Sequence, residues 1–77
     1  MSENTEIIFM QTRVLRLAAE RWNTSIQKAC GVFDKFGIFR FIRECYGIFH
    51  TEGDEAVLEE VMKVLDYRGV DIRAEIN

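Results

Sequence analysis

Apolar side chains recur three and four residues apart through much of the chain, the repeat that places them on one face of an α-helix. The first stripe includes Ile7, Met10 and Val14, and the clearest one, near the C-terminus, includes Val57 and Val61. The chain contains no proline, so no residue of this type interrupts a helix. The pattern therefore predicts an all-α protein.

Residues with strong capping preferences indicate where the helices begin and end. Thr5, Thr24 and Thr51 are predicted N-caps, because a threonine hydroxyl accepts a hydrogen bond from a free N–H group of the first turn. Gly37 and Gly47 are predicted to end two helices, because glycine adopts the left-handed conformation at low cost. We therefore expect four helices with short connections, at about 5–22, 24–36, 38–46 and 52–68.

The length of 77 residues allows one hydrophobic core and no second one. Residues 1–77 are therefore predicted to form a compact single helical domain. After Val70 apolar and charged residues alternate, which favours a short extended segment, and we expect the tail 70–77 to be loosely held. A domain of this size is only marginally stable alone, which favours association with a partner.

Charge is distributed unevenly along the chain, although the net charge is only −3. The segment from Arg13 to Arg43 has seven basic and two acidic residues, whereas the part from Glu44 onward is acidic. Such an asymmetry can steer a charged partner. Alternatively, the two segments form solvated faces that attract each other within the fold.

The composition indicates a cytoplasmic protein. No run approaches the roughly 18 apolar residues of a membrane span, and residues 2–4 do not resemble the start of a signal peptide. Cys30 and Cys45 are the only cysteines, and their spacing matches no metal or redox motif, so we expect free thiols and no cofactor.

The stretch from Cys45 to Asp54 contains the only histidine, His50. A general base needs an orienting partner and a pocket, and the sequence shows no second cluster that would converge on His50. A Cys–His pair is conceivable, but both cysteines occupy positions typical of a core, where the thiolate is suppressed. We therefore predict no catalytic residue and no metal ligand, and expect His50 to hydrogen-bond a helix end or to contact a partner.

Aromatic residues near arginines suggest a protein-binding surface. Phe9 lies off the inner stripe of the first helix near Arg13, and Phe39 lies off that of the third near Arg43. Exposed aromatics beside arginines are typical of interface hot spots. These residues, with Tyr46 and His50, are the predicted contacts to a protein partner or a second copy. The alternative is that the rings complete the core.

DNA binding is the second alternative, because the second and third helices lie in the basic segment and resemble a helix-turn-helix. However, the third helix offers mainly Ile38, Phe39, Phe41 and Ile42, with Arg40 and Arg43 as its only cations. A recognition helix needs polar side chains that reach base edges, so nucleic acid is the less favoured partner.

Several of these motifs together resemble a family of small bacterial proteins of unknown function. The similar parts are FDKFGI at 33–38, Tyr46, FHTEG at 49–53 and the stripe up to Leu65. Phe36 stands where the family often has tyrosine, and Glu52 where it often has glutamine. Members are often encoded beside proteins similar to ADP-ribosyltransferase toxins, which implies an antitoxin-like or accessory role. The residues expected to have signature or structural roles are Gly37, Gly47, His50, Thr51 and Gly53.

Overall fold

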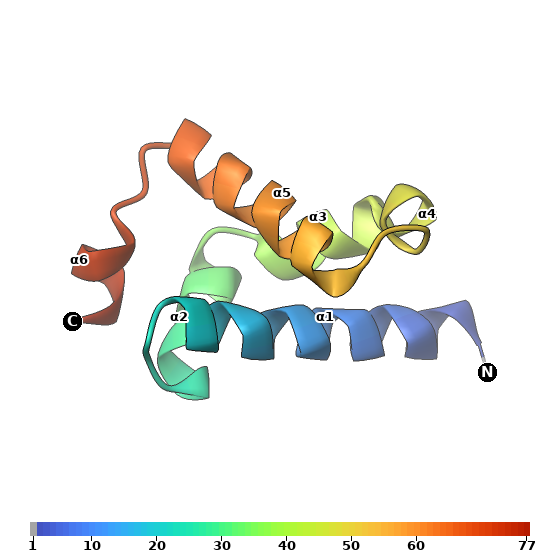
Figure 1. Cartoon of the computed structure of the whole chain (residues 1–77), viewed down its shortest axis with the longest axis horizontal. Helices are drawn as coiled ribbons and strands as arrows, with labels where there is room; N and C mark the ends of the chain where they lie inside the picture. Colours follow the sequence, from blue (N-terminus) through green and yellow to red (C-terminus); the bar gives the residue numbers. More distant parts are fainter. Residues whose placement is uncertain (1) are drawn as a thin grey trace.

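The computed structural model describes residues 2–77, and within this range the chain forms six α-helices and no strand (Figure 1). They are α1 (Glu3–Arg21), α2 (Ile26–Lys35), α3 (Ile38–Glu44), α4 (Tyr46–Phe49), α5 (Asp54–Tyr67) and α6 (Ile72–Ile76). The all-α prediction is confirmed, whereas the number of four helices is wrong, since α4 and α6 are additional. Of the helices in the described range, none is long and apolar enough to cross a membrane.

The longest helix, α1, forms one side of the molecule, and α5 crosses over it (Figure 1). Arg13 contacts Asp54, and Arg21 contacts Glu59, so the two helices run in the same general direction. This arrangement brings residues of the basic segment from Arg13 to Arg43 against the acidic part that begins at Glu44.

The core lies between α1, α2, α3 and α5, with Phe33 of α2 fully buried in it. Trp22 and Phe39 meet the Phe33 ring edge to face, at centroid distances of 6.0 and 5.3 Å. The predicted stripes on the first and last helices are confirmed as core. The largest fully buried side chains are Phe33, Ile38, Ile42, Leu58, Leu65, Val14, Val32, Val57 and Val61.

Helix α1 begins earlier than predicted, because Ser2 and not Thr5 is its N-cap. The Ser2 hydroxyl accepts a hydrogen bond from the backbone N–H of Thr5 at 3.3 Å, and Glu3 is the first helical residue. Glu3 and Glu6 then place negative charge in the first turn, where it interacts favourably with the helix dipole.

The prediction that Thr24 is the N-cap of the second helix is also wrong, because its backbone N–H belongs to the C-cap of α1. Asn23 adopts a left-handed φ of 52°, and the Thr24 N–H donates to the carbonyl of Ala19 at 3.0 Å. This is the hydrogen bond of a Schellman C-cap. The next residue, Ser25, caps α2 by accepting from the N–H of Lys28 at 3.1 Å.

The two glycines predicted to end helices behave differently. Gly37 has a left-handed φ of 68° between α2 and α3, as predicted. Gly47 lies inside α4, so its predicted role is wrong. The third predicted helix instead breaks at Cys45, whose carbonyl accepts from the N–H groups of Ile48 and Phe49, both at 2.9 Å. A new helix, α4, begins after Cys45. This change of direction places Phe49 in the core, where it is 5% exposed.

Helix α5 begins at Asp54 with Gly53 as its N-cap residue, so the predicted cap Thr51 is wrong. The Thr51 hydroxyl donates to the carbonyl of Ile48 at 2.8 Å and thus provides a hydrogen bond to a backbone carbonyl at the C-terminal end of α4. Thr51 therefore caps the preceding helix, because the intervening turn is longer than predicted.

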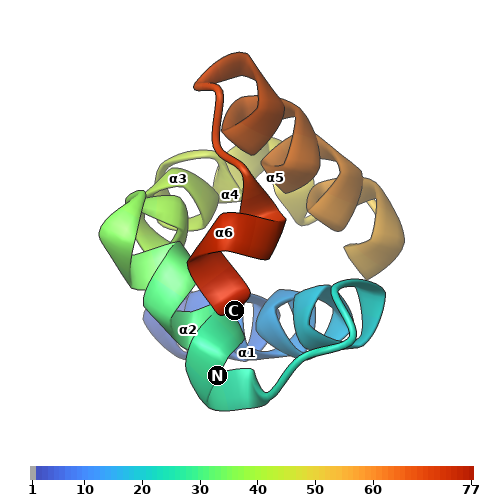
Figure 2. The same ribbon diagram turned by 90° about the vertical axis from the view of Figure 1, so that its left-hand side faces the viewer.

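The C-terminal tail forms the short helix α6, which corrects the predicted extended segment. In Figure 2, α6 lies in front of the bundle, over its end and beside α2. Asp71 caps it by accepting from the N–H of Arg73 at 3.1 Å. The side chains of Ile72 and Ile76 are half-buried and pack against the core.

Candidate partner-binding surface

The N-terminal half of α1 meets α4 at a surface hollow of about 270 Å³. Glu6, Phe9 and Arg13 come from α1, and Tyr46 comes from the first position of α4. Three of these four residues follow one another at i, i+3 and i+7, which places them on one face of α1. With His50, which stacks on Tyr46, the predicted partner contacts Phe9, Arg13 and Tyr46 define what we name the α1–α4 surface.

Tyr46 is held in place from two sides. Its hydroxyl donates to Oε2 of Glu6 at 3.1 Å, and its ring stacks on His50 with centroids 5.5 Å apart. Desolvation by partial burial, followed by the hydrogen bond and the negative charge of Glu6, raises the pKa of the Tyr46 phenol above its ordinary value. The phenol is therefore a neutral hydrogen-bond donor at neutral pH.

His50 is exposed and lies at the C-terminal end of α4. Its Nδ1 is 3.0 Å from the carbonyl oxygen of Tyr46. A carbonyl only accepts, so Nδ1 donates, and in the neutral ring Nε2 has the free lone pair. This contact matches the predicted hydrogen bond to a helix end, and it leaves Nε2 able to accept a hydrogen bond from a partner.

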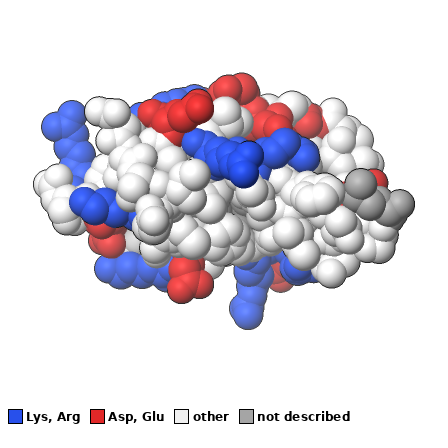
Figure 3. Space-filling view, turned by 90° about the horizontal axis from the view of Figure 1, so that it is seen from below, with Lys and Arg blue, Asp and Glu red and all other residues white. Residues whose placement is uncertain are grey.

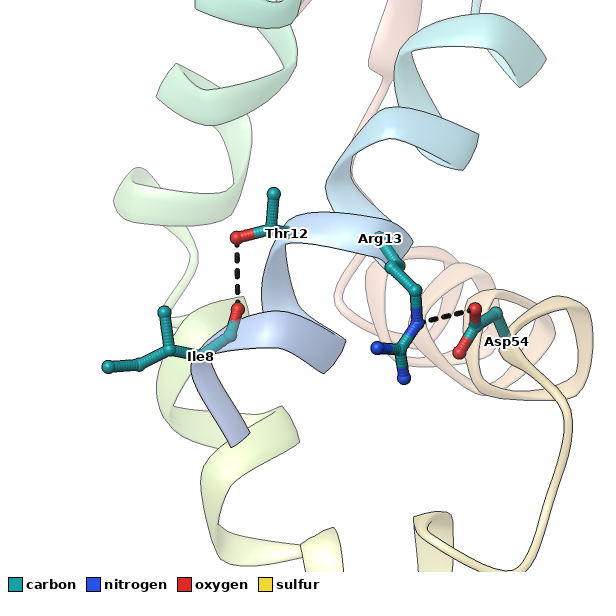
Figure 4. A network of polar contacts seen from close by, with 4 residues as sticks. All are labelled: Ile8, Thr12, Arg13 and Asp54. Atoms are coloured by element: carbon teal, nitrogen blue, oxygen red, sulfur yellow. Dashed lines mark hydrogen bonds and ion pairs between the residues drawn. The ribbon is translucent and has the colours of Figure 1, made fainter. Parts of the chain in front are cut away.

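Arg13 is fixed by an ion pair with the first residue of α5, as Figure 4 shows. Its Nε lies 2.8 Å from Oδ2 of Asp54, and the two side chains are 51% and 30% exposed. On the same helix, the Thr12 hydroxyl donates to the carbonyl of Ile8 at 2.9 Å, so it is satisfied locally.

The ion pairs link the basic and the acidic parts of the chain. Arg13 pairs with Asp54, Arg21 with Glu59 and Lys35 with Glu75, at 2.8, 2.8 and 3.0 Å. These contacts support the interpretation that the two oppositely charged segments attract each other within the fold. Among residues 2–77, the structure pairs no carboxylate with Arg16, Lys28, Arg40 or Arg43.

Phe39 and Arg43, the remaining predicted contacts, lie on α3. Phe39 is half-buried, packs against Phe33 and does not line the hollow, so it completes the core. Its carbonyl accepts from Nε2 of Gln11 at 2.8 Å. The Arg43 guanidinium donates to Oδ1 of Asn4 at 2.8 Å, which ties α3 to the start of α1. Whether these residues bind a partner stays a prediction.

Several exposed apolar side chains were not predicted. Ile26 is 49% exposed although its spacing indicates an inward position, and Ile48 of α4 is 66% exposed. Tyr67 is 92% exposed. It lies off the apolar stripe that contains Leu65, so its exposure to solvent could have been predicted from its position on the helix. In Figure 3, uncharged side chains occupy a continuous area through the middle of the α1 face, with most charges along its upper and lower edges.

The described part of the chain contains no group of three or more His, Cys, Asp or Glu side chains that could hold a metal ion. Cys30 and Cys45 are free and half-buried. The α1–α4 surface presents aromatic rings, an arginine and hydrogen-bonding groups.

Comparison with known proteins identifies a family for most of the chain. The model of a family described as a protein of unknown function (DUF3791) matches residues 9–68, which include the hollow except for Glu6. No curated protein and no solved structure matches the chain.

Proposed function

The chain belongs to the DUF3791 family of proteins of unknown function, and from this premise we propose that it is a non-enzymatic protein-interaction module. It binds a protein partner, or a second copy of itself, through the α1–α4 surface. The observation that supports this proposal is the exposed ring of Phe9, which is 48% exposed beside Arg13 and Tyr46.

Burial of the exposed half of the Phe9 ring against a partner would stabilise a complex by about 1 kcal/mol from transfer alone. Aromatic and arginine side chains that meet in a hollow are the usual hot spots of an interface. The α1–α4 surface combines both types with a hydroxyl and an imidazole.

The polar side chains around Phe9 are already ordered. Asp54 holds Arg13, Glu6 holds the Tyr46 hydroxyl, and the Tyr46 carbonyl holds His50. Less side-chain entropy is then lost on binding than if these groups moved freely. This order supports a surface that binds without large rearrangement.

The finer proposal is that the partner is a toxin similar to ADP-ribosyltransferases, which makes the protein antitoxin-like or accessory. It rests on the resemblance described above. A cytoplasmic location is part of the same proposal, and the two unpaired cysteines support it, because thiols stay reduced in that compartment.

The test compares truncation of two apolar side chains that are exposed to a similar fraction. Phe9→Ala removes the proposed contact, and Ile26→Ala is the matched control, since Ile26 is 49% exposed and lines a different part of the surface. Each tagged protein is used to capture partners from its native lysate, and native mass spectrometry identifies and weighs the complex.

We expect the unmodified protein and Ile26→Ala to retain a stoichiometric partner or a dimer, and Phe9→Ala to lose it with unchanged circular dichroism. Equal retention by both variants would show that the α1–α4 surface is not the contact. A monomer in all samples would contradict the proposal of an interaction module.

DNA binding remains the alternative function, supported by the four cations of the basic segment that have no carboxylate partner within residues 2–77. Phosphate contacts weaken steeply with salt, so the test is retention on duplex DNA as the salt concentration rises. A role in DNA binding would be favoured by retention that falls with salt and that Arg40→Gln and Arg43→Gln reduce. Phe9→Ala should leave this retention unchanged. Absence of retention at low salt would exclude it.

A further inference from the structure

A second surface hollow lies between α3 and α5, on residues that the α1–α4 surface does not use. It has a volume of about 500 Å³ and is lined by Phe41, Lys63, Val64, Tyr67 and Arg68. Four of these residues lie at i, i+1, i+4 and i+5, on one side of the C-terminal part of α5, and Phe41 faces them from α3. We name it the Tyr67 groove.

The apolar part of the groove is rigid on one side and open on the other. Phe41 is half-buried and meets Phe49 edge to face, with centroids 5.5 Å apart, so core packing fixes its ring. Tyr67 is 92% exposed at the last position of α5 and has almost no contact with the rest of the protein. A large aromatic ring left in water beside an apolar hollow is suited to close over an inserted side chain.

The charged residues that line the groove are both cations. The Lys63 side chain is 74% exposed, and its only carboxylate contact within residues 2–77 is to Glu60 of the same helix, at 3.5 Å. The Arg68 guanidinium donates to the carbonyl of Phe36, a neutral group, and so its positive charge is not balanced there. No carboxylate is among the residues that line the groove.

From this charge arrangement we propose that the Tyr67 groove binds a segment of a partner protein that presents a large apolar side chain beside an aspartate or glutamate. The apolar side chain lies on Phe41 and Val64 under the Tyr67 ring. The carboxylate lies between Lys63 and Arg68, where a planar guanidinium pairs with it in two hydrogen bonds. A basic or purely apolar segment would leave the Arg68 charge unbalanced and would leave Lys63 with only Glu60 of its own helix.

This proposal is independent of the α1–α4 surface. The two hollows share no lining residue, so Phe9→Ala leaves the Tyr67 groove unchanged. Failure of one proposal can therefore be distinguished from failure of the other.

The probe is a library of random twelve-residue peptides displayed on phage, selected against the full chain at low salt. We expect enriched peptides to combine a Leu, Ile, Met, Phe or Trp with a nearby Asp or Glu. A synthetic copy of the best peptide is then titrated against variants. Tyr67→Ala is expected to weaken its binding about tenfold or more, as loss of an aromatic hot spot does.

The matched charge control uses two exposed lysines. Lys63→Glu should abolish binding of the acidic peptide, whereas Lys28→Glu, on α2 and outside the groove, should reduce it only slightly through long-range charge. Because Tyr67 and Lys63 are exposed, these variants should fold as the unmodified protein does, which circular dichroism checks.

Three results would overturn the proposal. The first is enrichment of basic peptides or of none, and the second is equal affinity of the acidic peptide for Tyr67→Ala. The third is self-association of the chain that Tyr67→Ala removes, since the groove would then be occupied by a second copy.

Discussion

Nε of Arg13 lies 2.8 Å from Oδ2 of Asp54, and this contact joins two residues 41 positions apart in the sequence. It links the middle of α1 to the first residue of α5 and belongs to the set of ion pairs between the basic and acidic parts of the chain. Both side chains are partly exposed, so water and salt screen the attraction.

A double-mutant cycle on this pair should therefore give a small coupling energy. With Arg13→Gln and Asp54→Asn, we expect a coupling of about 0.2–1 kcal/mol in the free energy of unfolding, measured by urea denaturation. It should fall as salt rises. The control is a second cycle that combines Arg16→Gln with Asp54→Asn. It should show no coupling energy, because Arg16 pairs with no carboxylate in the described residues. Equal coupling for both arginines would argue against a specific pair.

Truncation of the buried phenylalanine should be far more costly than truncation of the exposed one. Phe33→Ala removes a fully buried ring, and we expect the free energy of unfolding to fall by about 3–5 kcal/mol. Phe9→Ala should lower it by only about 1 kcal/mol, because about half of its ring is already in water. Urea denaturation of both variants measures the difference, and similar losses would mean that Phe9 belongs to the core.

Two glycines should respond oppositely to alanine. Gly37→Ala places a side chain at a left-handed φ of 68°, and we expect a loss of about 1–2 kcal/mol in stability. Gly47→Ala lies inside α4 with open space around its Cβ, so it should be neutral or stabilising by about 0.5–1 kcal/mol. Thermal denaturation compares the two. A destabilising Gly47→Ala would support the original prediction that Gly47 ends a helix.

The raised pKa of Tyr46 gives a testable pH dependence. Folding raises this pKa above the unfolded value of about 10, because the neutral phenol is favoured by partial burial and by Glu6. The stabilisation is thus fully present below about pH 10 and is lost as pH rises through the folded-state pKa.

An absorbance titration of phenolate, taken as the difference between the unmodified protein and Tyr46→Phe, should show Tyr46 ionising above pH 10. Glu6→Gln should lower that pKa, since it removes the negative charge. Ionisation of Tyr46 below its ordinary value would contradict the contact with Glu6.

The tail should exchange its amide hydrogens faster than the long helices. Helix α6 has five residues, and half-buried side chains and one ion pair, Lys35 to Glu75 at 3.0 Å, hold it to the bundle. Local opening of such a segment costs little free energy. Hydrogen-exchange mass spectrometry should find 72–76 less protected than α1 and α5. Equal protection would show that the tail is an integral part of the core and would oppose the prediction of a loosely held tail.

The sequence by itself determined the helical class, the inner faces of α1 and α5, and the turn at Gly37. The helical class and the inner faces depend on the spacing of apolar residues along the chain, and the turn depends on the conformational freedom of glycine. Both can be read from a short stretch of sequence without knowledge of distant contacts. The same reasoning predicted the wrong N-cap where two residues with a strong N-cap preference, Thr24 and Ser25, are adjacent. There the hydrogen bond from the Thr24 N–H to Ala19 ended α1, and Ser25 was left to begin α2.

Only the tertiary structure decided which predicted surface residues lie together. Phe9 and Tyr46 line one hollow, where the Tyr46 hydroxyl of α4 bonds to Glu6 of α1, while Phe39, at a similar position relative to an arginine, turns toward Phe33. The break at Cys45 and the helical tail likewise depend on contacts with distant residues, since burial of Phe49 and Ile76 stabilises them. Local spacing gives the direction of a side chain on its own helix, but the position of that helix depends on the packing of the whole core.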